Sequence, residues 1–180
     1  MKFNFVSIPR CASQTIHEIF KVGNELNHSA ITKFPDRSLF SFAVIRNPVD
    51  HARSWFSFHK HKNVHLSEYK PFECYRCNFK EWVKKGFKTH WTKDDCKNHG
   101  VTHPVKQWDY VTENDKVVVD YLIKYDRLSF ELFRIGKKIG ITDYVLRVTS
   151  NSPKFEVEDK ERQAILEFFN KDEELYRKLK

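Results

Sequence analysis

The sequence has few glycines and no long apolar segment. Five of its 180 residues are glycine, and the first of them is Gly23. A Walker A phosphate loop requires glycines and ends in Gly-Lys-Ser or Gly-Lys-Thr, so the N-terminal region cannot form one. No apolar run approaches the roughly 20 residues that cross a bilayer, and the N-terminal segment MKFNFVSIPR lacks the apolar core of a signal peptide. We therefore expect no membrane span and a cytoplasmic location.

Repeats, low-complexity stretches and linkers rich in Gly, Pro or Ser are also missing. Hydrophobic residues make up 40% of the chain and aromatic residues 15%, which is enough for one domain with a hydrophobic core. We expect a single domain over residues 1–180, with an irregular insertion at about 60–105. The net charge of +8 favours anionic partners, among them nucleic acids, nucleotides and acidic glycans.

Strand and helix patterns alternate along the chain. We expect strands at 2–8, 41–45, 116–125 and 143–148, helices at 14–22, 48–59, 78–89, 128–138 and 159–179, and irregular segments at 59–77 and 90–105. This order predicts an α/β fold with three layers, in which helices cover both faces of a central, mainly parallel sheet. Ligands bind at the carboxyl ends of the strands in such sheets, so the segments after Ile8 and Ile45 are candidate binding sites.

The segment after the first strand has the residues of an anion site. It contains, in order, Arg10, Cys11, Ala12, Ser13, Gln14 and Thr15. Ser13 is the predicted N-cap of the following helix. A loop that opens onto a helix N-terminus presents backbone N–H groups and the positive end of the helix dipole to a phosphate. Arg10 adds a positive charge, and Ser13 and Thr15 add hydroxyl groups. An ordinary turn between a strand and a helix would also contain such residues.

A second candidate segment follows the strand at 41–45. Arg46 leaves the strand end, where a guanidinium can bind a phosphate with two hydrogen bonds. Pro48 suits the first turn of a helix. Ser54 lies about two turns along that helix, so its hydroxyl can point toward the same phosphate. The alternative is a helix-capping arginine with a solvent-facing serine.

Together the two segments resemble motifs of the sulfotransferases that use 3'-phosphoadenosine-5'-phosphosulfate (PAPS), chiefly the carbohydrate sulfotransferases. Residues 9–15 are similar to the family's 5'-phosphosulfate loop, PK[TV]xxTS. Arg46, Asn47, Pro48 and Ser54 match its 3'-phosphate motif, VR(D/N)PxxRxxSxY, with Ser54 at the expected spacing. The internal arginine of that motif falls two positions late, at Arg53, and is not transferred. Looser similarity at 78–82, 103–107, 119–126 and 170–176 extends the resemblance over most of the chain.

The resemblance implies a P-loop-like sulfotransferase fold and the transfer of a sulfonate group from PAPS to a hydroxyl group, with a carbohydrate as the expected acceptor. It places the 5'-phosphosulfate on residues 10–15 and the 3'-phosphate on Arg46 and Ser54. No catalytic metal is expected, because a sulfonate carries less charge than a phosphoryl group and protein cations can neutralise it. Arg10 stands where the family usually has lysine. It keeps the positive charge but is a very poor proton donor.

The transfer also needs a base that takes the proton of the acceptor hydroxyl. His28 lies between the two motifs, in a segment that loosely resembles the histidine segment of short carbohydrate-type members, and it is the predicted base. Other histidines near the motifs are alternatives, as are two residues on the first predicted helix. They are His59, His61 and His65, and His17 and Glu18.

Four residues between 74 and 99 have the spacing of zinc ligands. Cys74 and Cys77 form one close pair, and Cys96 and His99 form a second. We expect either a structural zinc ion on these four residues or unlinked thiols, since cysteines in a reducing compartment are seldom paired; export of the protein would instead favour a disulfide. His103 is an equal candidate for the fourth ligand.

Two other functions fit parts of the sequence. Val117–Asp120 imitates the Walker B strand of a P-loop nucleotide kinase or NTPase, but the missing glycines argue against that class. Aromatic residues interleaved with lysine at 55–62 could belong to a non-enzymatic, basic nucleic-acid-binding protein with a zinc knuckle. A helix with one core face and one solvated face explains the same pattern, so we expect no specific nucleic-acid partner.

Overall fold

The computed structural model describes residues 2–21, 28–61, 77–87, 89, 92–144 and 155–179 and has an α/β fold. Its strands are β1 (Asn4–Val6), β2 (Ser41–Ile45), β3 (Thr112–Glu113), β4 (Lys116–Val117) and β5 (Tyr121–Lys124). Its α-helices are α1 (Ser13–Phe20), α2 (Pro48–His61), α3 (Phe79–Lys84), α4 (Lys93–His99), α5 (Gln107–Val111), α6 (Leu128–Ile139), α7 (Asp159–Phe168) and α8 (Asn170–Lys178).

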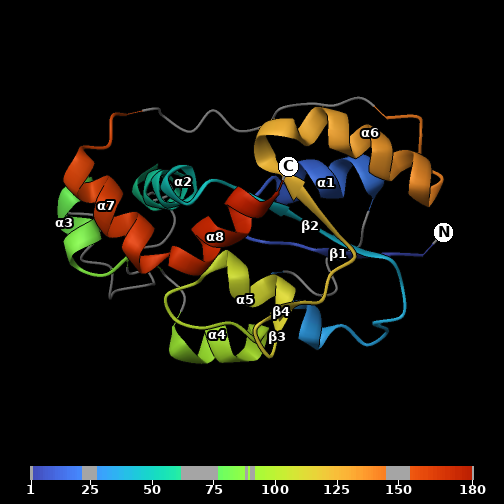
Figure 1. Cartoon of the computed structure of the whole chain (residues 1–180), viewed down its shortest axis with the longest axis horizontal. Helices are drawn as coiled ribbons and strands as arrows, with labels where there is room; N and C mark the ends of the chain where they lie inside the picture. Colours follow the sequence, from blue (N-terminus) through green and yellow to red (C-terminus); the bar gives the residue numbers. More distant parts are fainter. Residues whose placement is uncertain are drawn as a thin grey trace.

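A small parallel sheet lies at the centre, with β2 between β1 and β5. Figure 1 shows α1 and α6 together along one side of these strands and α4 and α5 on the opposite side. All five residues of β2 are buried. Because successive side chains of a strand point to opposite faces, both faces of β2 are covered. This confirms the predicted buried strand at 41–45.

Aromatic packing holds the central strand in place. The Phe42 ring of β2 lies 5.1 Å from the Phe5 ring of β1 and 6.0 Å from the Phe20 ring of α1, measured between centroids. On the same side of the sheet, α6 begins at the predicted residue, Leu128, and ends one residue later than predicted, at Ile139. Gly140 closes it with a φ of 79° in the left-handed region. The predicted helix at 128–138 is therefore confirmed.

Part of the expected irregular insertion at about 60–105 is helical. α3 lies within the predicted helix at 78–89, whereas the prediction of an irregular segment at 90–105 is wrong for residues 93–99, which form α4. Both helices begin with a capping box, formed by Asn78 and Glu81 in α3 and by Thr92 and Asp95 in α4. Gly100 closes α4 with a φ of 73°. These short signals made α4 predictable from the sequence, whereas the predicted helix at 78–89 is shorter than expected. Residues 62–76 lie outside the described residues.

The predicted strand at 116–125 is two separate strands. Residues Lys116–Val117 pair with Thr112–Glu113 in an antiparallel hairpin. Asn114 and Asp115 connect its strands with φ values of 50° and 58°, as expected for a two-residue hairpin turn. Only β5, after this hairpin, joins the parallel sheet. The prediction overlooked this turn because the valines that follow it suggested one continuous strand.

The predicted long helix at 159–179 is also interrupted. It consists of α7 and α8, with Phe169 between them at φ −101° and ψ 38°. The Phe169 ring is buried and lies 4.9 Å from the Phe87 ring. Burial of this aromatic side chain explains the change in direction. Of the predicted strand at 143–148, residues 143 and 144 are not in a strand, and the others lie outside the described residues.

The hydrophobic residues buried in the described part of the chain form one cluster. None of the described helices has the length and apolar character needed to cross a membrane.

Candidate functional site

The segment after β1 is a tight turn that leads into α1. Arg10 and Ala12 both have left-handed backbone angles, with φ values of 64° and 60°. The turn is closed by a hydrogen bond from the Cys11 N–H to the Ile8 carbonyl oxygen, over 3.2 Å. Residues other than glycine adopt left-handed backbone angles at a cost in conformational free energy, and such strain is found preferentially at functional sites.

Ser13 does not cap α1 as predicted. It is the first residue of the helix, and its hydroxyl donates a 2.7 Å hydrogen bond to the Ile8 carbonyl oxygen. Ala12 occupies the N-cap position, and no side chain caps the helix there. The first-turn N–H groups of α1 therefore have no side-chain cap, which leaves them available for an anion. Thr15 is buried in the helix, and Gln14 is exposed and donates to Glu18.

The segment after β2 is fixed by a helix cap. The Asn47 side chain accepts hydrogen bonds from the N–H groups of Val49 and Asp50, over 3.0 and 3.4 Å, at the start of α2. The prediction placed Pro48 in the first turn of a helix, and it is the first residue of α2. This cap determines where α2 begins, so it also determines which residues of α2 lie beside the β1 loop.

The two predicted segments meet at the carboxyl ends of β1 and β2. The Arg10 Nε donates to the Ser54 hydroxyl oxygen over 3.2 Å, and an Arg46 guanidinium nitrogen donates to the Arg10 carbonyl oxygen over 3.2 Å. Aromatic rings support both guanidinium groups, with Phe58 4.5 Å from Arg10 and Tyr125 4.5 Å from Arg46. The sequence motifs are therefore neighbours in space as well as being in the expected order.

The meeting point is positively charged. Among the described residues, neither Arg10 nor Arg46 forms an ion pair with a carboxylate, and the Arg46 Nε is buried without a hydrogen-bond partner. Burial lowers the pKa of Arg10, and the neighbouring charge of Arg46 lowers it further. Two close cations without a counter-ion stabilise a bound anion, because the anion relieves their mutual repulsion. Arg53 differs from both, since it pairs with Asp50 over 3.1 Å.

Gln107, at the start of α5, links the two segments. Its side-chain oxygen accepts hydrogen bonds from the Arg46 N–H over 2.8 Å and from the Cys11 thiol over 3.2 Å. Its amide nitrogen donates to the Arg46 carbonyl oxygen over 2.8 Å. Gln107 is fully buried. The sequence resemblance at 103–107 included this residue but gave it no function.

Two further buried groups hold this arrangement. The Asp172 carboxylate of α8 accepts hydrogen bonds from the N–H groups of Gln107 and Trp108, over 3.0 and 2.8 Å, and so caps α5. Burial raises the pKa of Asp172 to about 7. The His51 Nε2 of α2 donates to the Pro9 carbonyl oxygen over 2.9 Å, and burial lowers the pKa of His51 to about 3, so it is neutral. The sequence resemblance at 170–176 included Asp172 but gave it no function, and no motif identified His51.

Cys11 lies in the predicted phosphate loop but does not have the character of a nucleophile. Burial raises the pKa of its thiol to about 12. It is a fully buried, neutral donor to Gln107 and therefore contributes to the position of the loop.

His28 lies at the end of β1, close to the loop. Its Nδ1 is 2.8 Å from the Ser7 carbonyl oxygen and 3.3 Å from the Ser7 hydroxyl. A carbonyl oxygen only accepts hydrogen bonds, so Nδ1 carries the proton in the neutral ring, and Nε2 is the nitrogen that can accept one. The structure thus places the predicted base next to Ser7, just before the predicted phosphate loop.

The other base candidates are distributed differently. His17 and Glu18 lie on α1, and the ring centroid of His17 is 5.5 Å from that of Phe5. His59 and His61 are in the last turn of α2, and His65 lies outside the described residues.

The predicted zinc ligands are only partly described. Cys77 and Cys96 are buried, and the His99 Nδ1 is 3.1 Å from the Ser29 hydroxyl. The described residues contain no group of three or more His, Cys, Asp or Glu side chains that could hold a metal ion. Cys74 lies outside the described residues, and the zinc site stays a prediction from the sequence.

The chain matches no family model, no curated protein and no solved structure. The structure itself describes an α/β protein in which two arginines meet at the carboxyl ends of two adjacent parallel strands.

Proposed function

We propose that this chain is a PAPS-dependent sulfotransferase with a P-loop-like sulfotransferase fold, which transfers a sulfonate group to a hydroxyl group, in the first instance of a carbohydrate. One observation carries the proposal. Arg10 and Arg46 follow two different strands, and each donates a hydrogen bond to the segment of the other, Arg10 to Ser54 and Arg46 to the Arg10 carbonyl oxygen. Among the described residues, neither arginine has a carboxylate partner. A ligand with two separate anionic groups, such as a 3',5'-substituted nucleotide, suits two adjacent cationic segments.

The site residues have distinct proposed roles. The α1 N-terminus and Arg10 bind the 5'-phosphosulfate, and Arg46 with Ser54 binds the 3'-phosphate. Ser54 is buried and already in contact with Arg10, so it also aligns the two phosphate groups relative to each other. No metal is assigned to this site.

The proposed reaction uses the same residues. His28 takes the proton of the acceptor hydroxyl at Nε2 as the acceptor oxygen attacks sulfur. The bond between sulfur and the bridging phosphate oxygen breaks, and the electron pair leaves with adenosine 3',5'-bisphosphate. Arg10 stabilises the negative charge that grows on this oxygen, so its contribution is electrostatic rather than acidic.

The kinase or NTPase alternative receives less support from the geometry. A Walker B aspartate lies at the carboxyl end of its strand, near the phosphates. Asp120 instead precedes β5 and accepts hydrogen bonds from the Ser41 N–H and hydroxyl, over 2.7 and 2.8 Å, at the opposite end of the sheet. The loop before α1 also contains no glycine.

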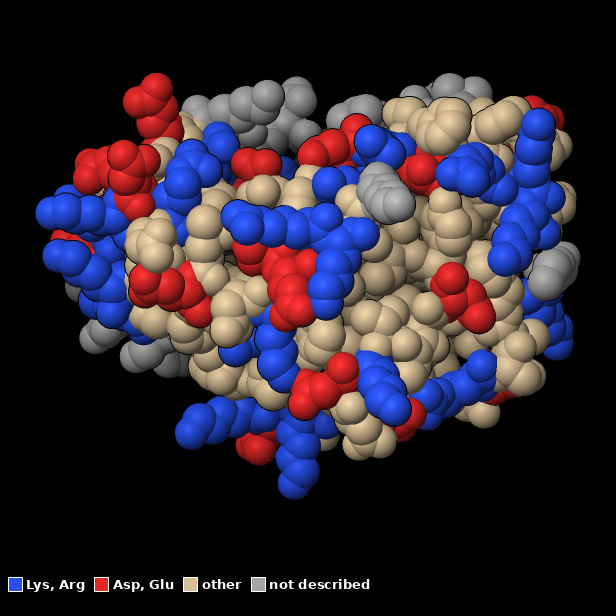
Figure 2. Space-filling model, viewed as in Figure 1, with Lys and Arg blue, Asp and Glu red and all other residues tan. Residues whose placement is uncertain are grey.

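The nucleic-acid alternative rests on the positive net charge and on the aromatic residues interleaved with lysine at 55–62. Figure 2 shows Lys and Arg side chains spread over this face and interspersed with Asp and Glu. A protein that tracks a phosphate backbone concentrates its cations along a stripe. The described face therefore gives this alternative no specific support.

Nucleotide binding tests the proposal. Adenosine 3',5'-bisphosphate should raise the Tm of the protein, because a ligand that binds only the native state stabilises it by mass action. AMP, which lacks the 3'-phosphate, should raise it much less. Arg46→Ala should weaken bisphosphate binding by about 10- to 100-fold, as expected for lost hydrogen bonds to a charged group. Arg37→Ala is the control, since Arg37 is exposed and pairs with Glu113.

Three results would change the assignment. Equal stabilisation by AMP and the bisphosphate would remove the role of Arg46 and Ser54. A strict Mg²⁺ requirement for binding would favour the kinase. If nucleotide binds as expected, transfer from labelled PAPS to a panel of glycans and small hydroxyl compounds would identify the acceptor class, and absence of transfer to every compound would argue against the enzymatic role.

A further inference from the structure

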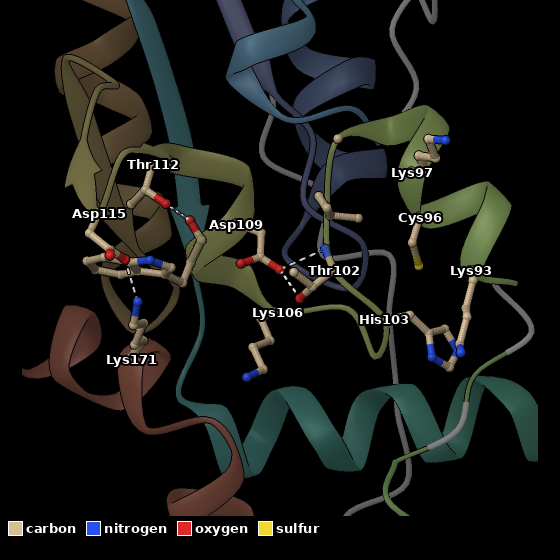
Figure 3. A pocket seen from close by; sticks show the side chains of 13 residues that line it. Lys93, Cys96, Lys97, Thr102, His103, Lys106, Asp109, Thr112, Asp115 and Lys171 are labelled. Carbon is tan, nitrogen blue, oxygen red and sulfur yellow. Dashed lines mark hydrogen bonds and ion pairs between the residues drawn. The ribbon is translucent and has the colours of Figure 1, made fainter.

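The groove beside α4 and α5 is lined largely by groups that already bind one another (Figure 3). Asp109 accepts two hydrogen bonds from Thr102. Lys171 pairs with Asp115, and its Nζ lies 5.0–6.0 Å class distance apart from no other ring than Trp108, at 5.5 Å from the ring centroid. These contacts join α5 and the β3–β4 hairpin to the neighbouring segments, so packing of the fold explains the groove.

The exposed aromatic surface of the described residues lies instead on α6, which is apolar on two opposite sides. Leu132, Ile135 and Ile139 are at most 1% exposed and belong to the core. Phe130 and Phe133 lie on the outer side and are 64% and 50% exposed. A surface helix of a globular protein normally presents charged and polar residues on the side away from the core. Two exposed phenylalanines one turn apart therefore indicate a contact surface.

Positive charge accompanies the two rings. Arg134 and Lys137 follow Phe130 and Phe133 by four residues and so lie on the same side of the helix. The Arg134 guanidinium carbon is 5.8 Å from the centroid of the Phe130 ring, and the Lys137 Nζ is 4.4 Å from that of the Phe133 ring. Both phenylalanines remain half exposed or more beside these cations.

The charge on this side of α6 is not balanced within the described part of the protein. Glu131 is the one carboxylate of α6, and it is buried 3.5 Å from Arg134. Arg127, Lys137 and Lys138 are exposed and form no ion pair among the described residues. We call this side the outer face of α6. It consists of Arg127, Phe130, Phe133, Arg134, Lys137 and Lys138.

The combination of rings and cations selects among partners. A symmetric contact with a second copy of the chain would place the same cations against each other. Stacking of nucleic-acid bases needs free ring faces, and a cation already lies over one face of each ring. An anionic bilayer suits both features. The rings can enter the boundary of the acyl chains, while the long side chains of Arg134 and Lys137 reach back to the headgroup phosphates.

We propose that the outer face of α6 binds to the surface of an anionic lipid bilayer, with Phe130 and Phe133 inserted at the acyl boundary. A helix of 12 residues is about 18 Å long, so α6 would lie in the plane of the surface. The inference does not rest on the proposed function, because Arg10, Arg46 and Ser54 are not part of this face.

Cosedimentation of the full chain with lipid vesicles tests the proposal. Wild type should bind vesicles of phosphatidylcholine and phosphatidylserine, and should bind pure phosphatidylcholine vesicles much less. Phe130→Ser/Phe133→Ser should bind the anionic vesicles at least about 10-fold more weakly, because the inserted apolar surface is lost. Its Tm should stay within about 2 °C of wild type, since both side chains are exposed. Val117→Ser, which removes an exposed apolar residue of β4, is the control and should bind like wild type.

A second pair of variants tests the charge. Arg134→Gln/Lys137→Gln should weaken binding to the anionic vesicles by about 30-fold, the loss expected for two basic residues near an anionic surface. Lys84→Gln/Lys160→Gln removes the same charge from exposed positions on α3 and α7, at the other end of the molecule in Figure 1. Binding of this control should fall by less than about 3-fold, because charges more than about 8 Å from the lipid surface are largely screened at physiological salt.

The other outcomes count against the proposal. Absence of binding to anionic vesicles would overturn it, and equal binding to pure phosphatidylcholine would show that charge is not recognised. Equal weakening by the two charge-removing variants would reduce the binding to attraction by the net charge. A dimer in sedimentation velocity that is lost in Phe130→Ser/Phe133→Ser would assign the face to a second copy. Tight binding of oligothymidylate with the same dependence on the phenylalanines would assign it to nucleic acid. Failure of adenosine 3',5'-bisphosphate to bind would contradict only the proposed function.

Discussion

Replacing Gln107 by leucine tests whether this one side chain joins the two halves of the site. Leucine has a similar size and is apolar, so it removes the hydrogen bonds without opening a large cavity. Gln107 is 0% exposed and makes two 2.8 Å hydrogen bonds to the backbone of Arg46 and one 3.2 Å contact with the Cys11 thiol. The substitution leaves the N–H and C=O of Arg46 without these partners.

The expected loss of stability follows from these contacts. A buried polar group without a partner costs about 1–3 kcal/mol. Arg46 is partly exposed, so water relieves some of this cost, and the free energy of unfolding should fall by about 2–3 kcal/mol. For a domain of this size each kcal/mol changes the Tm by about 2–4 °C. We therefore expect a Tm about 4–12 °C below that of wild type.

Thermal unfolding followed by circular dichroism measures this shift. Gln163→Leu is the matched control, because Gln163 is exposed on α7 and bonds only to Glu167 among the described residues. Its Tm should change by no more than about 2 °C, as is usual for surface substitutions. If both variants melt within about 2 °C of wild type, Gln107 does not hold the segments together. If Gln107 positions Arg46, its replacement should also weaken binding of adenosine 3',5'-bisphosphate more than binding of AMP.

Three further predictions concern other residues. His28→Ala should lower turnover by about 100-fold or more and leave bisphosphate affinity nearly unchanged, and normal turnover would place the base elsewhere. Burial raises the pKa of Asp172 to about 7, above the value of about 3.9 in an unfolded chain, so the folded protein retains this proton to higher pH. The contribution of Asp172 to the free energy of unfolding should therefore fall as pH rises from about 4 to about 7, and Asp172→Asn should remove this dependence. Elemental mass spectrometry should find about one zinc per chain if the zinc site exists, with loss of metal and of stability in Cys74→Ser; metal-free wild type would leave the cysteines as thiols.

The sequence by itself was sufficient for features that depend on local pattern. The nearly continuous apolar run at 41–45 predicted a strand buried on both faces, and the structure has it as the central strand. Pro48 and Gly140 marked the start of α2 and the end of α6 because their backbone preferences are strong and local. The two candidate anion segments were found in the same way, since each is a short stretch at a predicted strand end.

Tertiary packing decided the features that local pattern misjudged. The periodicity of 159–179 continues through Phe169, but burial of its ring against Phe87 breaks the helix there. The valines after Asp115 resemble a buried strand, but the hairpin turn at Asn114 and Asp115 exposes Val117 and brings only β5 into the sheet. In each case a contact distant in sequence, or a turn, outweighed the intrinsic preference of the segment.

The connection between the two anion segments is also a property of the tertiary structure alone. Arg10 and Ser54 are 44 positions apart in the sequence, and Gln107 and Asp172, which fix the loop, lie 65 positions apart. Nothing in the local sequence around Gln107 shows that its amide will be buried against Arg46. The hydrogen-bond partners of these residues are defined only in the folded chain. There the parallel sheet brings the ends of β1 and β2 to one edge, and Asp172 of α8 caps α5. The sequence therefore indicated which residues could bind an anion, and the fold determined which of them face one another.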